Sequence, residues 1–346
     1  MEDKRERKSE IALLNAVFCL LVVLIHILSY AIADADASSW QFAAIFFPWR
    51  FSAFVVQGFT FLSGMKLFLK SGGTEDWKSF YRRRFRKIIV PYLVWNCVYY
   101  AYFVAFGYYE FSAADLLRHI LLGTLISPFY YIIIISQFYL LTPISRKMSE
   151  KVHPMLRIIS ALLVTLFMWQ YLPQLVPGFK YNDRLFTTYL VYWVMGCCAG
   201  RYYEEFKRIL TENRAFIAIA FFAAAAMEGC FSFVNYTGRG YLPGGDLTQF
   251  IYCAAAIAFL YSMALYFSEK RNLPAIIRLA DRYSYTIYLS HLFIIFAVNH
   301  LISLIGISRI GPALAVRFAA VYLLIFAMCL FLSGLRKSAV SVRDKT

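Results

Sequence analysis

Long apolar segments alternate with short polar ones along the whole chain. Each apolar segment is long enough to cross the roughly 30 Å hydrocarbon core of a bilayer as a helix. The segments are too long and too continuous for the strands of a membrane barrel, the other structure that satisfies the backbone in lipid. The pattern therefore predicts an all-α, polytopic membrane protein in which residues 1–346 form a single transmembrane domain. The ten predicted spans are roughly 11–32, 47–69, 88–107, 125–144, 155–172, 185–203, 215–235, 248–268, 283–305 and 313–335.

The distribution of Lys and Arg predicts the orientation of the chain. If the N-terminus lies in the cytoplasm, 28 of the 35 Lys and Arg residues fall in cytoplasmic tails and loops. Cytoplasmic loops are enriched in these residues, so both termini are expected in the cytoplasm. The net charge of +15 does not indicate a nucleic-acid partner, because the basic residues lie in the gaps between apolar segments. Membrane lipids are their expected partners.

Neither the cysteines nor the histidines have the spacing of a metal site. The seven cysteines all lie within apolar segments. An odd number without metal-ligand spacing is typical of small buried side chains. Neither His26 nor His291 is followed by a histidine or carboxylate at the third or fourth position beyond it, the spacing of helical zinc sites. We therefore predict no metal, no disulfide and no tightly bound cofactor.

The first span contains the main catalytic candidate, His26. An ionisable residue inside a membrane helix is a functional-site hypothesis, because the cost of burying it must be offset. At about 1.5 Å per residue, His26 lies roughly 22 Å from Ile11, in the outer half of the membrane. The alternative is a packing histidine that hydrogen-bonds a neighbouring helix. A second histidine, His291 in the ninth span, is expected nearer the cytoplasmic side.

Three other polar side chains in the spans are candidates for substrate contact. Arg50, at the outer end of the second span, either extends to lipid headgroups or holds an anionic group or a carbonyl oxygen. Ser63 precedes Gly64, a pair that also allows close helix packing. Gln137 lies at mid-membrane and needs a hydrogen-bond partner there. Together with His291, these residues are candidates to orient an acceptor or to stabilise an oxyanion.

The densest run of positive charge directly precedes the third span. It contains Arg82, Arg83, Arg84 and Arg86. The guanidinium group matches the geometry of phosphate, so the run is a candidate phosphate-binding site on the cytoplasmic side. The alternative is an ordinary anchor to anionic lipid. Both interpretations are open at this point.

Several short motifs lie in order along the chain. They are His26 in the first helix, Ser63-Gly64 at the end of the second span, the Arg-rich run before Pro91-Tyr92, Gln137–Pro143, the helix with Gly196 and Gly200, and Tyr283–His291. Their order and spacing together resemble the acyltransferase-3 family of integral membrane acyltransferases over nearly the whole chain. The resemblance is closest to the Gram-positive branch that acts on cell-surface polysaccharides. One position departs from the family: Asn15 stands where an arginine is common, eleven residues before the histidine.

The resemblance implies a membrane O-acyltransferase. It would move an acyl group, expected to be acetyl, from cytoplasmic acyl-CoA to a hydroxyl of an exported cell-surface polysaccharide or glycan. His26 would be the catalytic residue, either as general base or as acyl carrier. Arg82, Arg83, Arg84 and Arg86 would bind the phosphates of the co-substrate acetyl-CoA. The implied location is the plasma membrane of a bacterium, and a homo-oligomer is left open. The alternative is a transporter or flippase that exports a polysaccharide or lipid-linked glycan without acyl transfer.

Overall fold

The computed structural model describes residues 8–69, 76–270 and 272–343. Within these ranges the regular elements are all helices, with no strand among them, which confirms the predicted all-α fold. Nine described helices are long and apolar enough to cross a membrane. They are Ser9–Asp34, Trp40–Phe68, Trp77–Ala105, Ser127–Lys151, Pro154–Leu175, Arg214–Tyr236, Gly245–Lys270, Ser284–Ile305 and Ile310–Arg336.

The expected span at 185–203 is not among these nine helices of the described chain. Its residues form a 3-10 turn, η4 (Phe186–Tyr189), and then α9 (Leu190–Arg201), which has 12 residues. At about 1.5 Å per residue, α9 is about 18 Å long, and at about 2 Å per residue η4 adds about 8 Å, so the segment is a shortened span. The side chain of Gln137 accepts a hydrogen bond from the Phe186 amide at 3.1 Å and so holds the turn that shortens this helix.

The helices group into two compact units, which are described separately. The first unit comprises Met1–Val55 together with Lys207–Thr346, and the second comprises Val56–Phe206. Two helices, α3 (Val55–Phe68) and α10 (Tyr203–Glu212), cross the division between the units.

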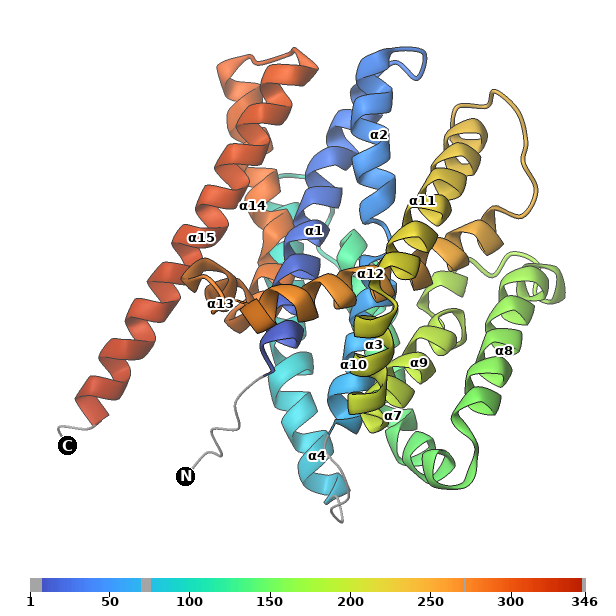
Figure 1. Ribbon diagram of the computed structural model, residues 1–346. Coiled ribbons are helices and arrows are strands. Elements are labelled where there is room, and N and C mark those ends of the chain that lie inside the picture. The colour runs from blue at the N-terminus through green and yellow to red at the C-terminus, as the bar shows by residue number, and fades with distance from the viewer. Residues whose placement is uncertain (1–7, 70–75, 271, 344–346) are drawn as a thin grey trace. The chain divides into compact units, whose positions relative to one another are not determined.

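Helix α1 (Ser9–Asp34) is central to the first unit (Figure 1). It packs against five of the unit's other helices, α2, α12, α13, α14 and α15. The bounds are α2 (Trp40–Ser52), α11 (Arg214–Tyr236), α12 (Gly245–Lys270), α13 (Ala275–Arg282), α14 (Ser284–Ile305) and α15 (Ile310–Arg343). In Figure 1, α2 runs beside α1, and α14 runs beside α15. Polar side chains on α1 therefore have protein partners within reach.

Close packing between α3 and α9 characterises the second unit. A Cβ at Gly196 or Gly200 on α9 would collide with the backbone of α3, and a Cβ at Gly64 on α3 would lie 2.6 Å from the Trp193 carbonyl oxygen. These contacts confirm that the Ser63-Gly64 pair allows close helix packing. The other elements are α4 (Trp77–Arg84), the π-helical turn η1 (Phe85–Ile89), α5 (Val90–Ala105), α6 (Ala113–Leu122), η2 (Ser127–Phe129), α7 (Tyr130–Lys151), α8 (Pro154–Leu175) and η3 (Asn182–Arg184).

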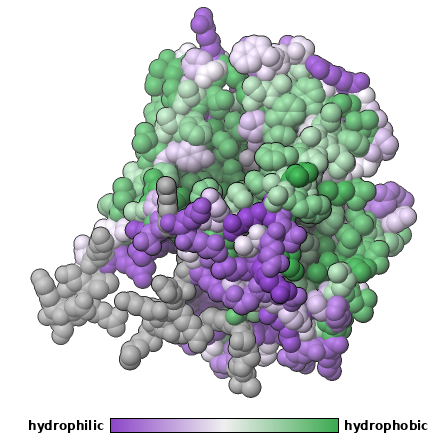
Figure 2. Space-filling view, viewed as in Figure 1, coloured by the Kyte–Doolittle hydropathy of each residue, from purple (hydrophilic) through white to green (hydrophobic). Residues whose placement is uncertain are grey.

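Much of the exposed surface is apolar (Figure 2). Large side chains such as Leu163, Phe222 and Leu323 are exposed on helices long enough to span a membrane. Apolar surface of this extent is typical of contact with lipid. It also explains why one expectation was wrong: Cys97 and Cys230 lie in apolar segments but are exposed. None of the seven cysteines, all of which the structure describes, forms a disulfide.

Candidate active site

The two intramembrane histidines form a pair in the first unit. The ring centroids of His26 on α1 and His291 on α14 are 5.1 Å apart, with the rings inclined at 39°. His291 is fully buried, with 0% of its surface exposed. The expectation that His291 lies at a different depth, nearer the cytoplasmic side, is therefore wrong.

The depth of His291 follows from the position at which α14 begins. Ser284, the first residue of α14, accepts a hydrogen bond from Asn15 at its Oγ (2.8 Å) and from Cys19 at its carbonyl oxygen (3.3 Å). His291 lies seven residues beyond Ser284, and His26 lies seven residues beyond Cys19. Both intervals correspond to about 10.5 Å of helix, so the two rings are level. Helix α14 starts this deep because α13, which precedes it, packs against α1.

The hydrogen bonds of His291 fix its tautomer. Its Nδ1 lies 2.8 Å from the carbonyl oxygen of Tyr288 and 3.1 Å from that of Ile287. Only an N–H can bond to a carbonyl oxygen, so we assign the hydrogen to Nδ1 and the free lone pair to Nε2 of the neutral ring. Nε2 is buried without a hydrogen-bond partner among the described residues. His26 also makes no hydrogen bond within that part of the chain, which leaves it available for chemistry.

Asn15, the position that departs from the family, pairs with a buried acid. Its Nδ2 donates to Asp281 Oδ1 at 2.9 Å, and both residues are buried. An amide satisfies part of the hydrogen-bonding capacity of a carboxylate without adding a positive charge. His26 lies about 16 Å further along α1. Asn15 therefore joins α1 to α13, and it does not extend toward the histidine pair.

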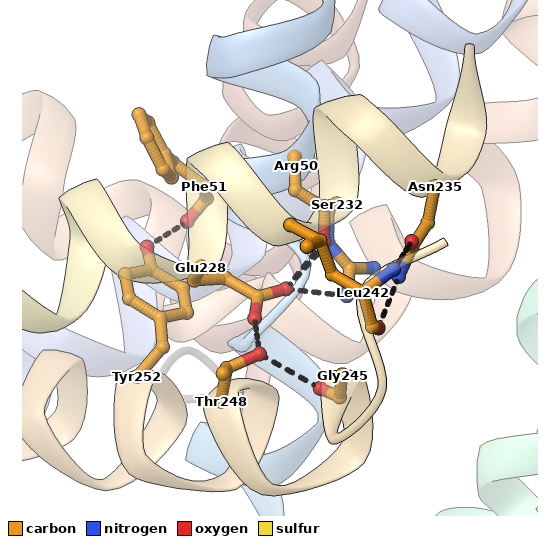
Figure 3. Close-up of polar contacts among 9 residues, drawn as sticks. All are labelled: Arg50, Phe51, Glu228, Ser232, Asn235, Leu242, Gly245, Thr248 and Tyr252. Carbon is orange, nitrogen blue, oxygen red and sulfur yellow. Dashed lines mark hydrogen bonds and ion pairs between the residues drawn. The ribbon is translucent and has the colours of Figure 1, made fainter. Parts of the chain in front are cut away.

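Arg50 on α2 is held by a buried acid from α11 (Figure 3). Its Nη2 and Nε lie 2.5 and 2.8 Å from Glu228 Oε1, and Nε also donates to Ser232 Oγ at 2.7 Å. Ser232 donates to Glu228 Oε1, and Thr248 on α12 donates to Oε2, both at 2.8 Å. The Glu228 side chain is 1% exposed and that of Arg50 is 21% exposed. The alternative in which Arg50 extends to lipid headgroups is therefore wrong.

Two further contacts hold the surroundings of this ion pair in place (Figure 3). The Asn235 side chain donates to the Leu242 carbonyl at 3.1 Å and accepts from the Leu242 amide at 2.7 Å, which fixes the loop between α11 and α12. The Tyr252 hydroxyl donates to the carbonyl oxygen of Phe51, the residue after Arg50, at 2.5 Å. The guanidinium of Arg50 is therefore positioned from α2, α11 and α12 together.

A cavity of about 350 Å³ lies beside Arg50. Its lining is aromatic and polar and consists of Phe46, Trp49, Arg50, Ser232, Asn235, Tyr236, Gly245, Asp246 and Gln249. The indole N–H of Trp49 donates to Ser29 Oγ on α1 at 3.1 Å. Ser29 lies three residues beyond His26, a rise of about 4.5 Å. One wall of the cavity therefore contacts α1 within one turn of the catalytic candidate.

Two other candidates, Ser63 and Gln137, lie in the second unit. Ser63 Oγ is 3.4 Å from the Tyr131 hydroxyl. Gln137 uses both ends of its amide on the backbone: Nε2 donates to the Arg184 carbonyl at 2.7 Å, and Oε1 accepts from the Phe186 amide at 3.1 Å. The amide thus has the partners that its position in the membrane requires. These bonds hold the turn that precedes α9.

The basic run is helical. Its first residues complete α4, and the remainder lies in η1, which continues directly into α5. Pro91, near the start of α5, has no N–H to donate to the carbonyl four residues earlier, and a π-helical turn is one way to accommodate that gap. The third span therefore begins earlier than the predicted residue 88, because its helix extends back to Trp77.

The four arginines of the run differ in their surroundings. Three are exposed, namely Arg82, Arg83 and Arg86. Arg84 is half-buried, and its guanidinium lies 5.2 Å from the ring centroid of Phe80 and 4.8 Å from that of Tyr139. Such cation–π contacts use the faces of the rings to hold the charge. The exposed arginines are the ones available to a phosphate.

Sequence reasoning missed the buried acids Glu228 and Asp281. Glu228 lies inside the apolar segment 215–235, and the rule that selected His26 would also have selected it. Asp281 follows a polar loop, where an acidic residue is ordinary, so no comparable signal existed. Neither sequence position indicates its partner, because Glu228 is 178 residues from Arg50 and Asp281 is 266 residues from Asn15.

The nine span-length helices of the described chain define an integral membrane protein, and the pair of His26 and His291 is its candidate active site. A family model described as an acyltransferase domain matches residues 9–333, and the chain belongs to this family, acyltransferase-3. The chain is also 25% identical over 340 residues to YfiQ of Bacillus subtilis (strain 168), a candidate membrane-bound acyltransferase, with 92% of this chain and 88% of the relative covered. No solved structure matches the chain significantly.

Proposed function

We propose that this acyltransferase moves an acetyl group from cytoplasmic acyl-CoA to a hydroxyl of an exported cell-surface glycan at a bacterial plasma membrane. Membership of the family supports acyl transfer. The site assignment rests on the pairing of His26 with His291. His26 lies about one helical turn from Ser29, the residue that Trp49 of the cavity contacts. The aromatic, amide and carboxylate groups of that cavity suit the rings and hydroxyls of a sugar.

In the proposed reaction His26 acts as general base. Neutral imidazole has a lone pair that takes the proton of the acceptor hydroxyl. The hydroxyl oxygen bonds to the thioester carbonyl carbon, the carbon–sulfur bond breaks, and the departing thiolate receives the proton from His26. The unprotonated Nε2 of His291 offers a buried hydrogen-bond acceptor beside His26 while His26 carries that proton. Arg50, directed by Glu228, orients the acceptor in the cavity.

The exposed arginines of the basic run are proposed to bind the donor. Arg82, Arg83 and Arg86 are free to form charge-assisted hydrogen bonds with the phosphates of acyl-CoA. Arg84, which stacks on two rings, holds the helical segment against α7. With both termini in the cytoplasm, this segment faces the side of the membrane on which acyl-CoA is available.

Incubation of the purified protein with labelled acetyl-CoA and a hydroxyl-bearing glycan tests the proposal. The wild type should label the glycan, and His26→Ala should abolish the transfer. A matched control is His300→Ala, which removes an exposed histidine from α14, and it should keep full activity. Label retained on the protein would indicate an acyl-histidine intermediate in place of direct transfer. Undiminished labelling of glycan by His26→Ala would overturn the site. Glycan export without any labelling would support the transporter alternative.

A further inference from the structure

Three arginines outside the basic run come together at helix ends in the second unit. They are Arg146 near the end of α7, Arg157 in the first turns of α8 and Arg201 at the end of α9. Arg201 Nη1 donates to Ser149 Oγ at 2.7 Å, and Ser149 Oγ donates in turn to the Arg146 carbonyl at 2.7 Å. Arg146 Nη2 donates to a carbonyl of α3, that of Leu67, at 3.0 Å. The helix ends are thus tied together by arginine hydrogen bonds.

Arg157 lies among the same groups. It is in electrostatic range of the neighbouring thiols Cys197 and Cys198 on α9. Arg146 is also in electrostatic range of Cys197, and Arg201 is in electrostatic range of Cys198. Because α8 packs directly on α9, the three arginines lie near one short segment of α9.

Arg157 is buried without a counter-charge. It is 6% exposed, and its Nε and Nη2 have no hydrogen-bond partner among the residues that the structure describes. No carboxylate among the described residues lies within ion-pair distance of it. A buried cation without a partner is costly, so such groups normally pair with an anion. Because Arg157 has no such partner within the described chain, we expect an anionic ligand to bind it.

We propose that Arg157 and Arg201 form a binding site for a phosphate group, with Arg146 holding its α7 side in place. A guanidinium presents several N–H donors in a planar fork, which matches the oxygens of a phosphate. Two such groups on adjacent helices suit an anion with several acceptor oxygens better than a single carboxylate. The site is separate from the arginines of the basic run, which lie on α4 and η1, and it does not depend on the proposed acetyl transfer.

Two carriers of phosphate reach a membrane acyltransferase: the headgroup of an anionic phospholipid and a soluble nucleotide such as that of coenzyme A. Thermal unfolding of delipidated protein in nonionic detergent distinguishes them. Phosphatidylglycerol is added in mixed micelles in one arm, and adenosine 3′,5′-bisphosphate in the other. A ligand that binds only the folded state raises Tm as its concentration rises. We expect one of the two probes to raise the Tm of the wild type.

The variants decide whether Arg157 is responsible. Arg157→Gln should bind the active probe at least about tenfold more weakly, as expected for the loss of a charged hydrogen bond. The matched control Lys151→Gln removes an exposed cation at the end of α7 and should bind like the wild type. Without a probe, Arg157→Gln should unfold at the wild-type temperature or above it, because it removes an uncompensated buried charge.

A rise with phosphatidylglycerol alone identifies a lipid site, and a rise with the bisphosphate alone identifies a nucleotide site. No rise with either probe overturns the proposal, and so does an equal rise in Arg157→Gln. If Arg157→Gln is unstable without a probe, Arg157 has a partner within the protein and the proposal is again overturned. Arg201→Gln, which alters an exposed residue, provides an independent measure of probe affinity and should also weaken it.

Discussion

The ion pair between Arg50 and Glu228 allows a quantitative test of how the cavity is built. Glu228 is 1% exposed and Arg50 is 21% exposed, so removal of Arg50 leaves the more deeply buried charge unpaired. Loss of one partner of a buried pair typically costs about 3–5 kcal/mol. We expect Arg50→Gln to lower the free energy of unfolding by about 3 kcal/mol, at the low end because Ser232 and Thr248 still donate to Glu228.

The reverse change should cost less. Glu228→Gln leaves Arg50 with part of its surface exposed, and we expect a loss of about 2 kcal/mol. The double variant removes both charges and should also lose only about 2 kcal/mol, well below the sum of the single effects. The difference between the double variant and the sum of the single variants is the interaction free energy of the pair, because the separate cost of each substitution cancels.

Unfolding in mixed detergent micelles measures these free energies, and steady-state kinetics measure the function. Arg309→Gln, which removes an exposed cation from the same unit, is the control and should change stability by less than about 0.5 kcal/mol. Both single variants should raise KM for the glycan more than KM for acetyl-CoA, because Arg50 lines the cavity. Additive stability losses would refute the buried-pair reasoning, and an unchanged KM for the glycan would refute the acceptor role of the cavity.

Three other predictions follow from the structure. Gly200→Ala should destabilise the protein because its Cβ meets the α3 backbone, whereas Gly334→Ala, in open space on α15, should stabilise or be neutral; thermal unfolding compares them. Burial lowers the pKa of His119 below its usual 6.5, so its contribution to stability should be present above pH 6.5 and decline as the pH falls below it; a wild-type pH dependence unchanged in His119→Gln would contradict this. In a cysteine-free background, a cysteine at exposed Tyr241 should react with an impermeant thiol reagent in intact cells. A cysteine at exposed Lys78 should react only after lysis. The opposite pattern would show that the orientation is inverted.

The fold could be predicted from the sequence because the length of an apolar segment is a local property that lipid imposes directly. The prediction was least accurate where a distant side chain intervened. The segment 185–203 is apolar throughout its centre, but Gln137, on α7, fixes a turn at Phe186 and leaves a helix of 12 residues. The prediction that the cysteines are buried failed for a related reason. Apolar sequence indicates contact with lipid or with protein, and Cys97 and Cys230 are exposed on the surface of their helices.

The site could be predicted only in part because its geometry depends on the register between helices. The cost of burying an imidazole singled out His26 from its own segment. The position of His291 depends instead on α13, which packs against α1 and sets the level at which α14 begins. No local pattern encodes that level. The hydrogen bonds of Ser284 to Asn15 and Cys19 fix it, and they place the second imidazole beside the first.

Polar residues in apolar spans can be separated into structural and functional ones by the hydrogen-bonding capacity that they retain. Every buried polar group needs partners, so burial alone does not distinguish them. Gln137 uses both ends of its amide on the backbone, which makes it a structural residue. His291 keeps a buried Nε2 without a partner among the described residues, and Arg50 keeps an exposed face toward the cavity. Arg157 keeps two unpartnered guanidinium nitrogens by the same criterion. Capacity of this kind is costly in the ligand-free protein, and binding of a substrate or ligand is what offsets it.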